Sequence, residues 1–429
     1  MKEFLKKFLP NFVLSFYHFI LAFLGALIYG FPSKKLTVIG VTGTKGKSTV
    51  VNFIGRILEE AGYRVGWVSS LSFKIGSREW LNPYHMTMPG RFLLQKTLKQ
   101  MVKEKCHYAI LEVTSEGILQ HRHRFIDFKI AVFTGLAPEH IERHGSFENY
   151  RKAKGKLFKS AKKIHILNLD DENVQYFLKF QAKQKFGFTV QKDQFNFKVP
   201  NLNLVKAHNI RSSFRGIDFT IENIPFRLNL LGDFNVSNAL AAVSLGLSQG
   251  ISLEISRRAL GKIEKIPGRM EKIEKGQNFT IIVDLAHTPD SFEAVFRTIK
   301  CLPHKRVISI FGAAGGLRDK WKRPVLGKIA AKYSDFIILC NEDPYDERPG
   351  AILDAIEKGI IEAGFKKENY LKIEDRRAAI RKGLEMAKEN DVVLVLGKGT
   401  EQTMVIGNRT IPWDDRKVVQ EEFENLYKQ

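Results

Sequence analysis

Cysteine is scarce in this chain, which has three cysteines among 429 residues. Cys106, Cys301 and Cys340 are far apart, and their spacing fits neither a zinc site nor a disulfide framework. This usage is typical of a reducing compartment. Low-complexity tracts and internal repeats are also lacking. The length allows two or three domains, each with its own core.

Acidic residues are fewer than basic ones. The chain has 46 Asp and Glu against 68 Lys and Arg, a net charge of +22. Such an excess favours anionic partners, namely nucleotides, nucleic acid or an acidic membrane surface, and does not choose among them. The basic residues are dispersed and are not interleaved with aromatic residues in clusters, which argues against a nucleic-acid-binding NTPase.

Charged side chains are absent from residues 8–33, a stretch longer than the roughly 20 residues that cross a bilayer. Five aromatic residues recur there at helical spacing: Phe8, Phe12, Phe16, Phe19 and Phe23. Pro10 suits the first turn of a helix, and Gly30 with Pro32 suits its end. We therefore expect residues 1–35 to form an apolar helix that anchors the protein in or on a membrane. A helix buried against the protein or a partner, and a cleaved export signal, are the alternatives.

Residues 40–49 read GVTGTKGKST. An apolar run of strand type precedes them at 36–39, and the apolar spacing of a helix follows them from 50 to 61. A phosphate-binding loop needs this context, because the N–H groups at the helix N-terminus point at the anion and Lys47 adds a positive charge. A plain glycine turn would have no need of Lys47 and Ser48 together.

The loop departs from the commonest phosphate-loop spacing, which asks for glycine where Val41 stands. The variant G-T-x-G-K-[ST]-T resembles that of the Mur ligases, which join an amino acid to a carboxylate at the expense of ATP. The resemblance covers residues 36 to about 416. It implies an α/β protein with a central ATP-binding P-loop domain and mainly parallel sheet over 36–266, and a Rossmann-like amino-acid-binding domain over 267–429. The phosphates of ATP would be bound by Gly43, Thr44, Lys45, Gly46, Lys47, Ser48 and Thr49.

Residues 111–122 read LEVTSEGILQHR and resemble E-V-S-S-H-x-L-x-Q-H-R of the Mur branch that adds the third residue of the peptidoglycan stem. The resemblance implies that Glu112 binds Mg²⁺ together with Ser48. Glu112 ends an apolar run, which places it at the carboxyl end of a strand, where ligands bind in open α/β sheets. Glu116 stands where the family has histidine. The resemblance also implies acceptor-substrate contacts by Thr87, Thr114, Gln120 and Arg122.

A second metal ion follows from the stretch AVFTGLAPEHIERHGSFENYRKAKGKLF, which is similar to V-F-T-N-L-x-x-D-H-L-D-x-H-G and Y-x-x-A-K-x-x-L-F of the family. The resemblance implies that His140 holds a second Mg²⁺ and that Lys154 is carbamylated and serves as a metal ligand. Two cations would let the charged phosphates and a carboxylate approach one another. Judged without the family, Lys154 is one basic residue on a solvated helix face.

Three further stretches, LLGDFNVSNALAA, IPGRMEKI and VDLAHTPDSF, also resemble family motifs. The first implies that Asn235 meets the adenine, while Asn238 starts or supports the following helix. The second implies that Arg269 reaches the γ-phosphate. The third implies that Asp284 binds the ribose and that His287 lies near the nucleotide.

The C-terminal half alternates strand-like and helical stretches, with strands expected at 307–311, 336–339 and 392–396. This alternation is typical of a parallel sheet in a Rossmann-like domain. In the family this domain reads the incoming amino acid. The resemblance implies that Arg318 binds its α-carboxylate, and that Gly397 and Glu401 in LGKGTEQ contact a substrate amine.

The stretch NEDPYDERP bears on which amino acid is added. Family enzymes that add meso-diaminopimelate have D-N-P-R here, and their arginine grips the distal carboxylate. This chain has Glu342, Asp343 and Tyr345 around the proline, which favours a side chain that ends in an ammonium group, such as lysine or ornithine. Arg323 or Arg348 is the alternative partner for a distal carboxylate.

Three-domain Mur ligases begin with a domain that holds the UDP moiety, and the 35 residues before the first expected strand are too few for it. We therefore expect the acceptor to be held by the basic surface of the central domain or to be lipid-linked. The predicted activity is an ATP-dependent acid–amino-acid ligase that forms an acyl phosphate and adds a lysine-like diamino acid or meso-diaminopimelate to UDP-N-acetylmuramoyl-L-Ala-D-Glu.

Folylpolyglutamate synthase-like and cyanophycin synthetase-like ligases, and a membrane-tethered nucleic-acid-binding NTPase, are the alternatives. The stretches LEVTSEGILQHR and AHTPD favour the muramyl branch. We expect a cytoplasmic monomer that uses ATP and two Mg²⁺ ions, binds no nucleic acid, and attaches to the inner face of the plasma membrane.

Overall fold

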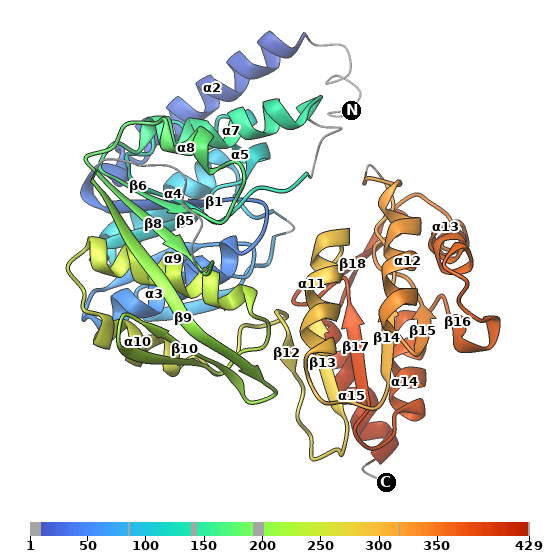
Figure 1. The fold of residues 1–429 in the computed structure, drawn as a ribbon. Helices are drawn as coiled ribbons and strands as arrows, with labels where there is room; N and C mark the ends of the chain where they lie inside the picture. Colours follow the sequence, from blue (N-terminus) through green and yellow to red (C-terminus); the bar gives the residue numbers. More distant parts are fainter. Residues whose placement is uncertain (1–9, 85, 139–143, 192–200, 317, 428–429) are drawn as a thin grey trace. The chain divides into compact units, whose positions relative to one another are not determined.

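The computed structural model describes residues 10–84, 86–138, 144–191, 201–316 and 318–427 (Figure 1). The chain divides into two compact units. Unit 1 comprises residues 1–211, 218–228 and 234–262, and unit 2 comprises residues 212–217, 229–233 and 263–429.

Unit 1 is built around a sheet that has eleven strands in the described chain, in the order β11-β10-β9-β8-β7-β6-β1-β5-β2-β3-β4. The strands are β1 (Thr37–Thr42), β2 (Val65–Val68), β3 (Ser72–Ile75), β4 (Arg78–Leu81), β5 (Tyr108–Glu112), β6 (Phe128–Phe133), β7 (Ile164–Asn168), β8 (Gln184–Thr189), β9 (Leu202–Ser213), β10 (Gly216–Ile221) and β11 (Ile224–Leu228). From β2 through β5, β1, β6, β7 and β8 to β9 the neighbouring strands are parallel, and β3 and β4 are antiparallel additions at one edge.

Helices cover both faces of the central strands of unit 1. They are α3 (Lys47–Glu60), α4 (Arg91–Lys103), α5 (Ser115–Leu119), α7 (Phe147–Ser160), α8 (Val174–Leu178), α9 (Phe234–Ser248) and α10 (Leu253–Gly261). Residues of α4, α5, α7 and α8 share one hydrophobic core with the sheet, while α3 packs with α9 and α10. Because β1 and β5 are buried on both faces, both read as apolar runs without alternation.

The apolar N-terminal segment forms helix α2 (Asn11–Ile28), followed by the 3₁₀ turn η1 (Pro32–Lys35). Ala22 and Ala26 are buried where α2 packs against α4. Apart from this contact, α2 exposes large apolar side chains: Phe12, Phe16, Tyr17, Phe19, Ile20, Phe23, Leu24, Leu27 and Ile28. Among the described residues, no helix combines the length and the apolar character needed to cross a membrane.

Unit 2 contains a six-stranded sheet in the order β12-β13-β17-β14-β15-β16. Its strands are β12 (Glu271–Lys272), β13 (Thr280–Asp284), β14 (Val307–Phe311), β15 (Phe336–Leu339), β16 (Tyr370–Lys372) and β17 (Val392–Leu396). All neighbours are parallel except β12 and β13. A separate hairpin consists of β18 (Thr403–Ile406) and β19 (Arg409–Pro412).

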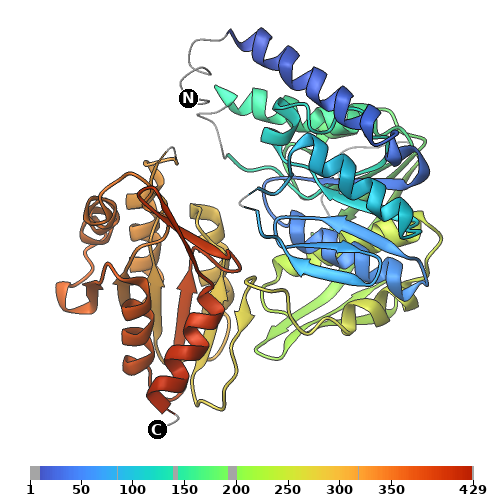
Figure 2. The same cartoon turned by 180° about the vertical axis from the view of Figure 1, so that it is seen from behind.

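Alternate residues of the unit 2 strands enter two different cores. Ile282 and Leu394 pack with helices α11 (Pro289–Lys300), α12 (Lys322–Tyr333) and α13 (Pro349–Glu362). Ile281 and Val393 pack with α14 (Arg376–Met386) and α15 (Asp415–Tyr427) on the other face. Figures 1 and 2 show these two helical layers from opposite sides. The 3₁₀ turn η2 (Lys367–Asn369) leads into β16. These sheets confirm the predicted α/β class with mainly parallel strands.

Candidate functional site

The glycine-rich loop joins the carboxyl end of β1 to α3. Gly46 caps α3 with a φ of 79°, in the left-handed region that favours glycine, and the first turn of the helix contains no acidic side chain. A Cβ on Gly46 would lie 2.4 Å from Oδ1 of Asn238, so the position is closed to larger residues. The N–H groups of the first helical turn can therefore face an anion, as in phosphate-binding loops.

Lys47 folds back over this loop. Its Nζ donates a hydrogen bond to the carbonyl oxygen of Thr44 at 2.8 Å and lies 3.9 Å from Oε1 of Glu112. The structure thus places the ammonium group between the loop and the acidic end of the neighbouring strand. This position suits a cation that contacts the outer phosphates of a nucleotide.

Oxygen donors gather beside Lys47 at the carboxyl ends of three parallel strands. Oε2 of Glu112 accepts hydrogen bonds from the N–H of Ser70 at 2.8 Å and from its hydroxyl at 3.2 Å. The hydroxyl of Ser48 lies 2.7 Å from that of Ser70. Glu112 pairs with Val41 in the β1–β5 register, which explains why the carboxylate reaches the loop.

This donor set fits Mg²⁺, which is held by few protein carboxylates together with water and phosphate oxygens. The described residues include no group of three or more His, Cys, Asp or Glu side chains that could hold a metal ion. A site here would therefore rely on hydroxyl oxygens and on the nucleotide. His140, the predicted ligand of a second ion, lies outside the described residues.

Lys154 reaches the same loop from α7. Its side chain is buried, and its Nζ donates a hydrogen bond to the carbonyl oxygen of Gly43 at 2.7 Å. The ammonium group also lies 4.6 Å from the centre of the Tyr150 ring. Without the family resemblance, the sequence predicts that Lys154 lies on a solvated helix face. This prediction is wrong, because the side chain points into unit 1. Lys152, Lys156 and Lys159 are exposed on α7.

The two predicted asparagines lie in the first turns of α9. Nδ2 of Asn238 donates to Oδ1 of Asn235 at 3.0 Å, and both side chains are buried. Asn238 is the one adjacent to Gly46, so it packs against the loop that we predict binds phosphate. One residue of the loop, Thr44, is also held by α7, because its hydroxyl lies 3.0 Å from that of Tyr150.

Three of the four predicted acceptor residues lie close together. Arg122 donates hydrogen bonds to Oε1 of Gln120 at 2.7 Å and to the carbonyl oxygen of Met88. Thr87 is half-buried in the segment directly before Met88. Arg91, which the sequence did not suggest, donates to the carbonyl oxygen of Gln120 at 3.0 and 2.6 Å. Burial, together with nearby Arg122, lowers the pKa of Arg91 to about 10.

The hydroxyl of Thr114, the fourth predicted acceptor residue, is used within the protein. It is the N-cap of α5, and its hydroxyl accepts a hydrogen bond from the N–H of Gly117 at 3.0 Å. Glu116, which replaces the histidine of the family, accepts a hydrogen bond from Nε2 of Gln120 at 2.7 Å. This departure from the family therefore orients Gln120.

In unit 2, Asp284 ends β13 and is buried. Its two oxygens accept hydrogen bonds from the N–H groups of Met270 at 2.7 Å and Ala286 at 2.6 Å. Burial raises the pKa of Asp284, although nearby Arg269 opposes this shift. The carboxylate thus joins the segment that carries Arg269 to the segment that leads to His287. A ring nitrogen of His287, Nδ1, lies 2.8 Å from the carbonyl oxygen of Leu285.

The predicted amino-acid site lies at the carboxyl edge of the unit 2 sheet, where β15 and β17 end. Lys398 is fully buried and forms ion pairs with Asp343 at 2.8 Å and Glu401 at 2.7 Å. Asp343 also accepts a hydrogen bond from the N–H of Val405 at 2.8 Å. Two of the predicted contact residues are therefore bound to the protein itself.

Glu342 differs from its acidic neighbours. It is buried, and its Oε2 has no hydrogen-bond partner among the described residues. A Cβ on Gly397 would lie 2.8 Å from this oxygen, so glycine leaves room for the carboxylate. Burial raises the pKa of Glu342, and Lys322 and Lys398 oppose the shift. A buried carboxylate with an unused oxygen is suited to bind a cation.

The remaining predicted residues of this site have different surroundings. Tyr345 adopts a φ of 52° and exchanges backbone hydrogen bonds with the β18–β19 hairpin. Arg323 is buried and binds both carboxylate oxygens of Glu347 at 3.0 Å, so it is engaged within the protein. Arg318 and Arg348 are exposed.

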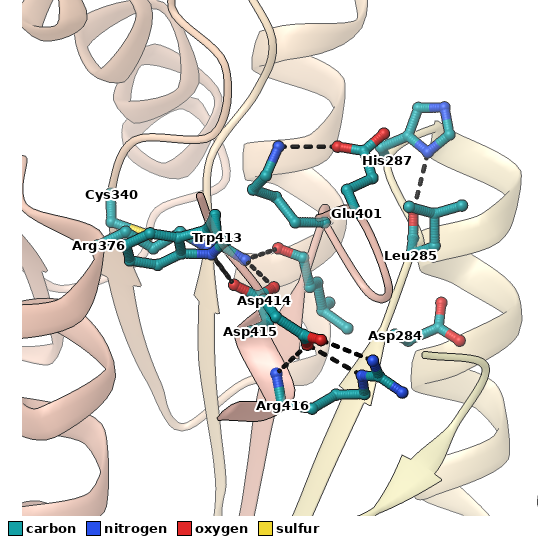
Figure 3. A network of polar contacts seen from close by, with 12 residues as sticks. Asp284, Leu285, His287, Cys340, Arg376, Glu401, Trp413, Asp414, Asp415 and Arg416 are labelled. Atoms are coloured by element: carbon teal, nitrogen blue, oxygen red, sulfur yellow. Dashed lines mark hydrogen bonds and ion pairs between the residues drawn. The ribbon is translucent and has the colours of Figure 1, made fainter. Parts of the chain in front are cut away.

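A second buried ion pair lies near the carboxyl end of β17 (Figure 3). Arg376 binds the two oxygens of Asp415 at 2.8 and 2.6 Å, and it also donates to the carbonyl oxygen of Leu396 at 2.9 Å. The indole N–H of Trp413 donates to the same carboxylate at 2.8 Å. The contacts fix the end of β17, and with it the loop that carries Gly397.

The fold and these contacts define a nucleotide-binding enzyme with a phosphate-loop unit followed by a Rossmann-like unit. Residues 41–246 match the Mur ligase middle domain, and residues 268–399 match the Mur ligase, glutamate ligase domain. The chain belongs to the Mur ligase family, whose members are ATP-dependent ligases that form amide bonds and use ATP and Mg²⁺. The family predicted from the sequence is confirmed.

The similar proteins are named as ligases of the third-residue branch. The UDP-N-acetylmuramoyl-L-alanyl-D-glutamate–2,6-diaminopimelate ligase of Clostridium botulinum is 38% identical over 407 residues, which are 94% of this chain and 80% of that protein. The UDP-N-acetylmuramyl-tripeptide synthetase of Roseiflexus is 37% identical over 414 residues, covering 92% and 80%.

One solved structure has the same name as the Clostridium botulinum relative, and a second has the same fold. A structure of a UDP-N-acetylmuramoyl-L-alanyl-D-glutamate–2,6-diaminopimelate ligase is similar with a TM-score of 0.62 at 28% identity, covering 91% of this chain and 79% of that one. The folylpolyglutamate synthase of Mycobacterium tuberculosis has a TM-score of 0.70 at 14% identity, covering 97% and 96%. At that identity the second likeness shows the fold alone.

Sequence reasoning missed Ser70, which links Ser48 to Glu112. The available signal was the serine pair that follows β2, because β2 and β5 are parallel neighbours and their carboxyl ends meet at one edge. It also did not assign Arg91 to the acceptor region, since that contact depends on how α4 packs.

Proposed function

We propose that this chain adds the third residue to UDP-N-acetylmuramoyl-L-Ala-D-Glu, with residues 36–266 as the ATP-binding domain and 267–429 as the domain that binds the amino acid. One observation carries the proposal: Lys47, Ser48 and Glu112 meet at the carboxyl edge of the unit 1 sheet, on the same unit as Gln120 and Arg122. The names of the similar proteins support the same reaction.

The reaction proceeds in two steps. A carboxylate oxygen of the acceptor attacks the γ-phosphorus of ATP, the bond to ADP breaks, and an acyl phosphate forms. The amine of the incoming amino acid then attacks the acyl carbon, phosphate leaves, and the amine loses a proton. Lys47 and the N–H groups of α3 stabilise the phosphate charge in the first step, and Arg269 contacts the γ-phosphate. Positioning and charge stabilisation provide the rate enhancement.

Metal ions belong to this proposal. Mg²⁺, when bound, neutralises phosphate charge. Ser48 and Glu112 would hold one ion. A carbamate on Lys154, with His140, would hold a second ion, and the burial of the Lys154 amine against Gly43 of the phosphate loop supports this role.

The incoming amino acid would have a cationic end. We assign recognition of that end to Glu342, because its Oε2 is unpartnered among the described residues and buried, whereas Asp343 and Glu401 bind Lys398. Lysine and ornithine carry such an ammonium group on the side chain. Diaminopimelate carries one as well, beside a carboxylate, so Glu342 is compatible with all three.

The most exposed apolar side chains of α2, such as Phe12 and Phe16, would lie on the inner face of the plasma membrane. The helix has no charged residue, and the exposed Lys34 and Lys35 lie in the 3₁₀ turn η1 that follows it. Aromatic and aliphatic side chains flanked by lysine are typical of helices that lie in the membrane interface. We propose that the enzyme works at the membrane surface, and as a monomer.

Phosphate release tests the proposal directly. The full-length protein is incubated with UDP-N-acetylmuramoyl-L-Ala-D-Glu, ATP and Mg²⁺, and lysine, ornithine and meso-diaminopimelate are compared. Turnover that requires both acceptor and amino acid is expected. Turnover with a folate and glutamate instead, or stimulation by nucleic acid without an amino acid, would overturn it.

A further inference from the structure

The segment after α5 combines two predicted acceptor residues with a strained backbone. Gln120 and Arg122 flank His121, which has a φ of 57°, and Phe125 has a φ of 60°. Residues with a Cβ rarely adopt this region. Such a conformation persists only where surrounding contacts hold it in place. Residues 120–125 are called the acceptor loop below.

Helix α2 supplies such contacts through one row of side chains. The hydroxyl of Ser15 lies 2.8 Å from Nε2 of His121. The ring of Phe19 meets His121 edge-on with centroids 5.9 Å apart, and Phe125 at 5.2 Å. Phe23 adds an edge-on contact with Phe125 at 5.4 Å. Residues 15, 19 and 23 are each four apart, so they share one side of the helix.

The acceptor loop is also held by a second helix. Arg91 of α4 donates two hydrogen bonds to the carbonyl oxygen of Gln120, and α4 itself packs against α2. The loop is therefore contacted by two helices that pack against each other. Both strained residues, His121 and Phe125, contact α2. Helix α2 therefore stabilises the backbone conformation that positions Gln120 and Arg122.

We propose that α2 is part of the acceptor site and that Ser15, Phe19 and Phe23 are positioning residues for Gln120 and Arg122. This inference rests on the proposed function, in which those two residues bind the acceptor. It goes beyond attachment to a membrane, because the side of α2 that carries Ser15 faces the protein. Lipid contact instead concerns the most exposed side chains of the helix, among them Phe12 and Phe16, whereas Phe19 and Phe23 are 38% and 40% exposed and contact the acceptor loop.

The test measures initial rates of the full-length enzyme without vesicles, with the acceptor varied at saturating ATP and amino acid. Loss of the Ser15–His121 hydrogen bond in Ser15→Ala is expected to raise the KM for the acceptor about tenfold, with kcat and the KM for ATP nearly unchanged. Ser15→Thr, which keeps the hydroxyl, should restore most of the affinity. Phe19→Leu keeps apolar volume and should raise the same KM by a smaller factor.

Phe16→Ala is the matched control. Phe16 is 64% exposed, so its removal should leave the KM for the acceptor unchanged while weakening binding to anionic vesicles. An unchanged acceptor KM in Ser15→Ala and Phe19→Leu would overturn the inference. An equal rise in Phe16→Ala would do the same, because it would show a general effect of altering α2.

Hydrogen exchange separates this inference from the proposed function. Amides of the acceptor loop should exchange faster in Ser15→Ala than in the wild type or Phe16→Ala, whatever the acceptor is. If the wild type does not use the muramyl acceptor, the proposed function fails, and exchange still decides whether α2 holds the loop. Unchanged exchange in Ser15→Ala would refute the positioning role.

Discussion

The ammonium group of Lys398 and the carboxylate of Asp343 form an ion pair of 2.8 Å inside unit 2. Burial opposes the charged form of Lys398, but Glu401 and Asp343 outweigh it, and the pKa of Lys398 is raised. The other oxygen of Asp343 accepts the N–H of Val405, so this carboxylate also attaches the β18–β19 hairpin to the sheet edge.

This arrangement predicts that Asp343→Asn destabilises the protein. The substitution leaves a buried ammonium group with Glu401 as its remaining carboxylate, and breaking a buried ion pair costs about 3 kcal/mol or more. Unfolding in urea, followed by tryptophan fluorescence, should show the loss. Asp346→Asn is the control, because Asp346 is exposed, and its effect should stay within about 0.5 kcal/mol. Equal unfolding midpoints for the two variants would contradict the assignment.

Glu342 gives a prediction about pH. Its pKa in the folded protein is raised by burial above the ordinary 4.5, so the folded state favours the protonated form. Its contribution to stability is complete below the unfolded pKa and is lost as the pH rises through the folded pKa. Glu342→Gln, which carries no charge, should therefore melt at a higher temperature than the wild type at neutral pH, and this difference should vanish below about pH 4.5. Melting curves from about pH 4 to about pH 8 test this. A difference that is constant across the range would show that Glu342 does not titrate as described.

The same variant tests the choice of amino acid. Glu342→Gln should lower kcat/KM for the amino acid with an ammonium end by at least about tenfold, because a charge-assisted hydrogen bond is lost. The KM for ATP should not change. Norleucine, which has the shape of lysine without the ammonium group, provides the control substrate, and its low rate should not fall further. A parallel fall for norleucine would assign Glu342 to the fold and not to recognition.

Three strands of unit 2 were predictable because each is a short apolar run that is almost entirely buried. The expected strands at 307–311, 336–339 and 392–396 coincide with β14, β15 and β17. By contrast, β9 over Leu202–Ser213 was not predicted. Most of its residues are exposed or half-buried, so its hydrophobic pattern carries little information.

The motifs predicted which residues belong together but not how they contact one another. Glu112 and Ser48 were both expected at the metal site, and they are connected through Ser70, which no motif contains. Likewise, the sequence did not separate the roles of Glu342 and Asp343. Their different roles follow from the buried Lys398, whose position depends on how β17 pairs with its neighbours.

Replacing Gly46 should disturb the phosphate loop. Gly46→Ala must place a Cβ both at a φ of 79° and within 2.4 Å of Oδ1 of Asn238. Gly62→Ala is a matched control with a φ of 87°, where no atom lies within 4 Å of the added Cβ. Both variants should lose about 1 kcal/mol of stability from the backbone. Only Gly46→Ala should also abolish ATP-dependent turnover, and turnover equal to that of Gly62→Ala would remove Gly46 from the proposed ATP site.

Lys154 offers a test of the proposed carbamate. Lys154→Arg keeps a positive charge, but a guanidinium stays protonated and does not add carbon dioxide as a neutral amine does. In ¹³C NMR with labelled bicarbonate, a carbamate signal is expected for the wild type and for Lys156→Arg, an exposed lysine on the same helix. It should be absent in Lys154→Arg, together with at least about a hundredfold loss of turnover.

Because arginine is larger than the buried lysine that it replaces, Lys154→Gln is examined in parallel, and the melting temperature of each variant is measured. A folded Lys154→Gln without turnover and without the signal supports the carbamate. If the wild type lacks the signal while turnover still requires Lys154, the amine itself is the functional group. Its hydrogen bond to Gly43 would then hold the phosphate loop in the conformation that binds ATP.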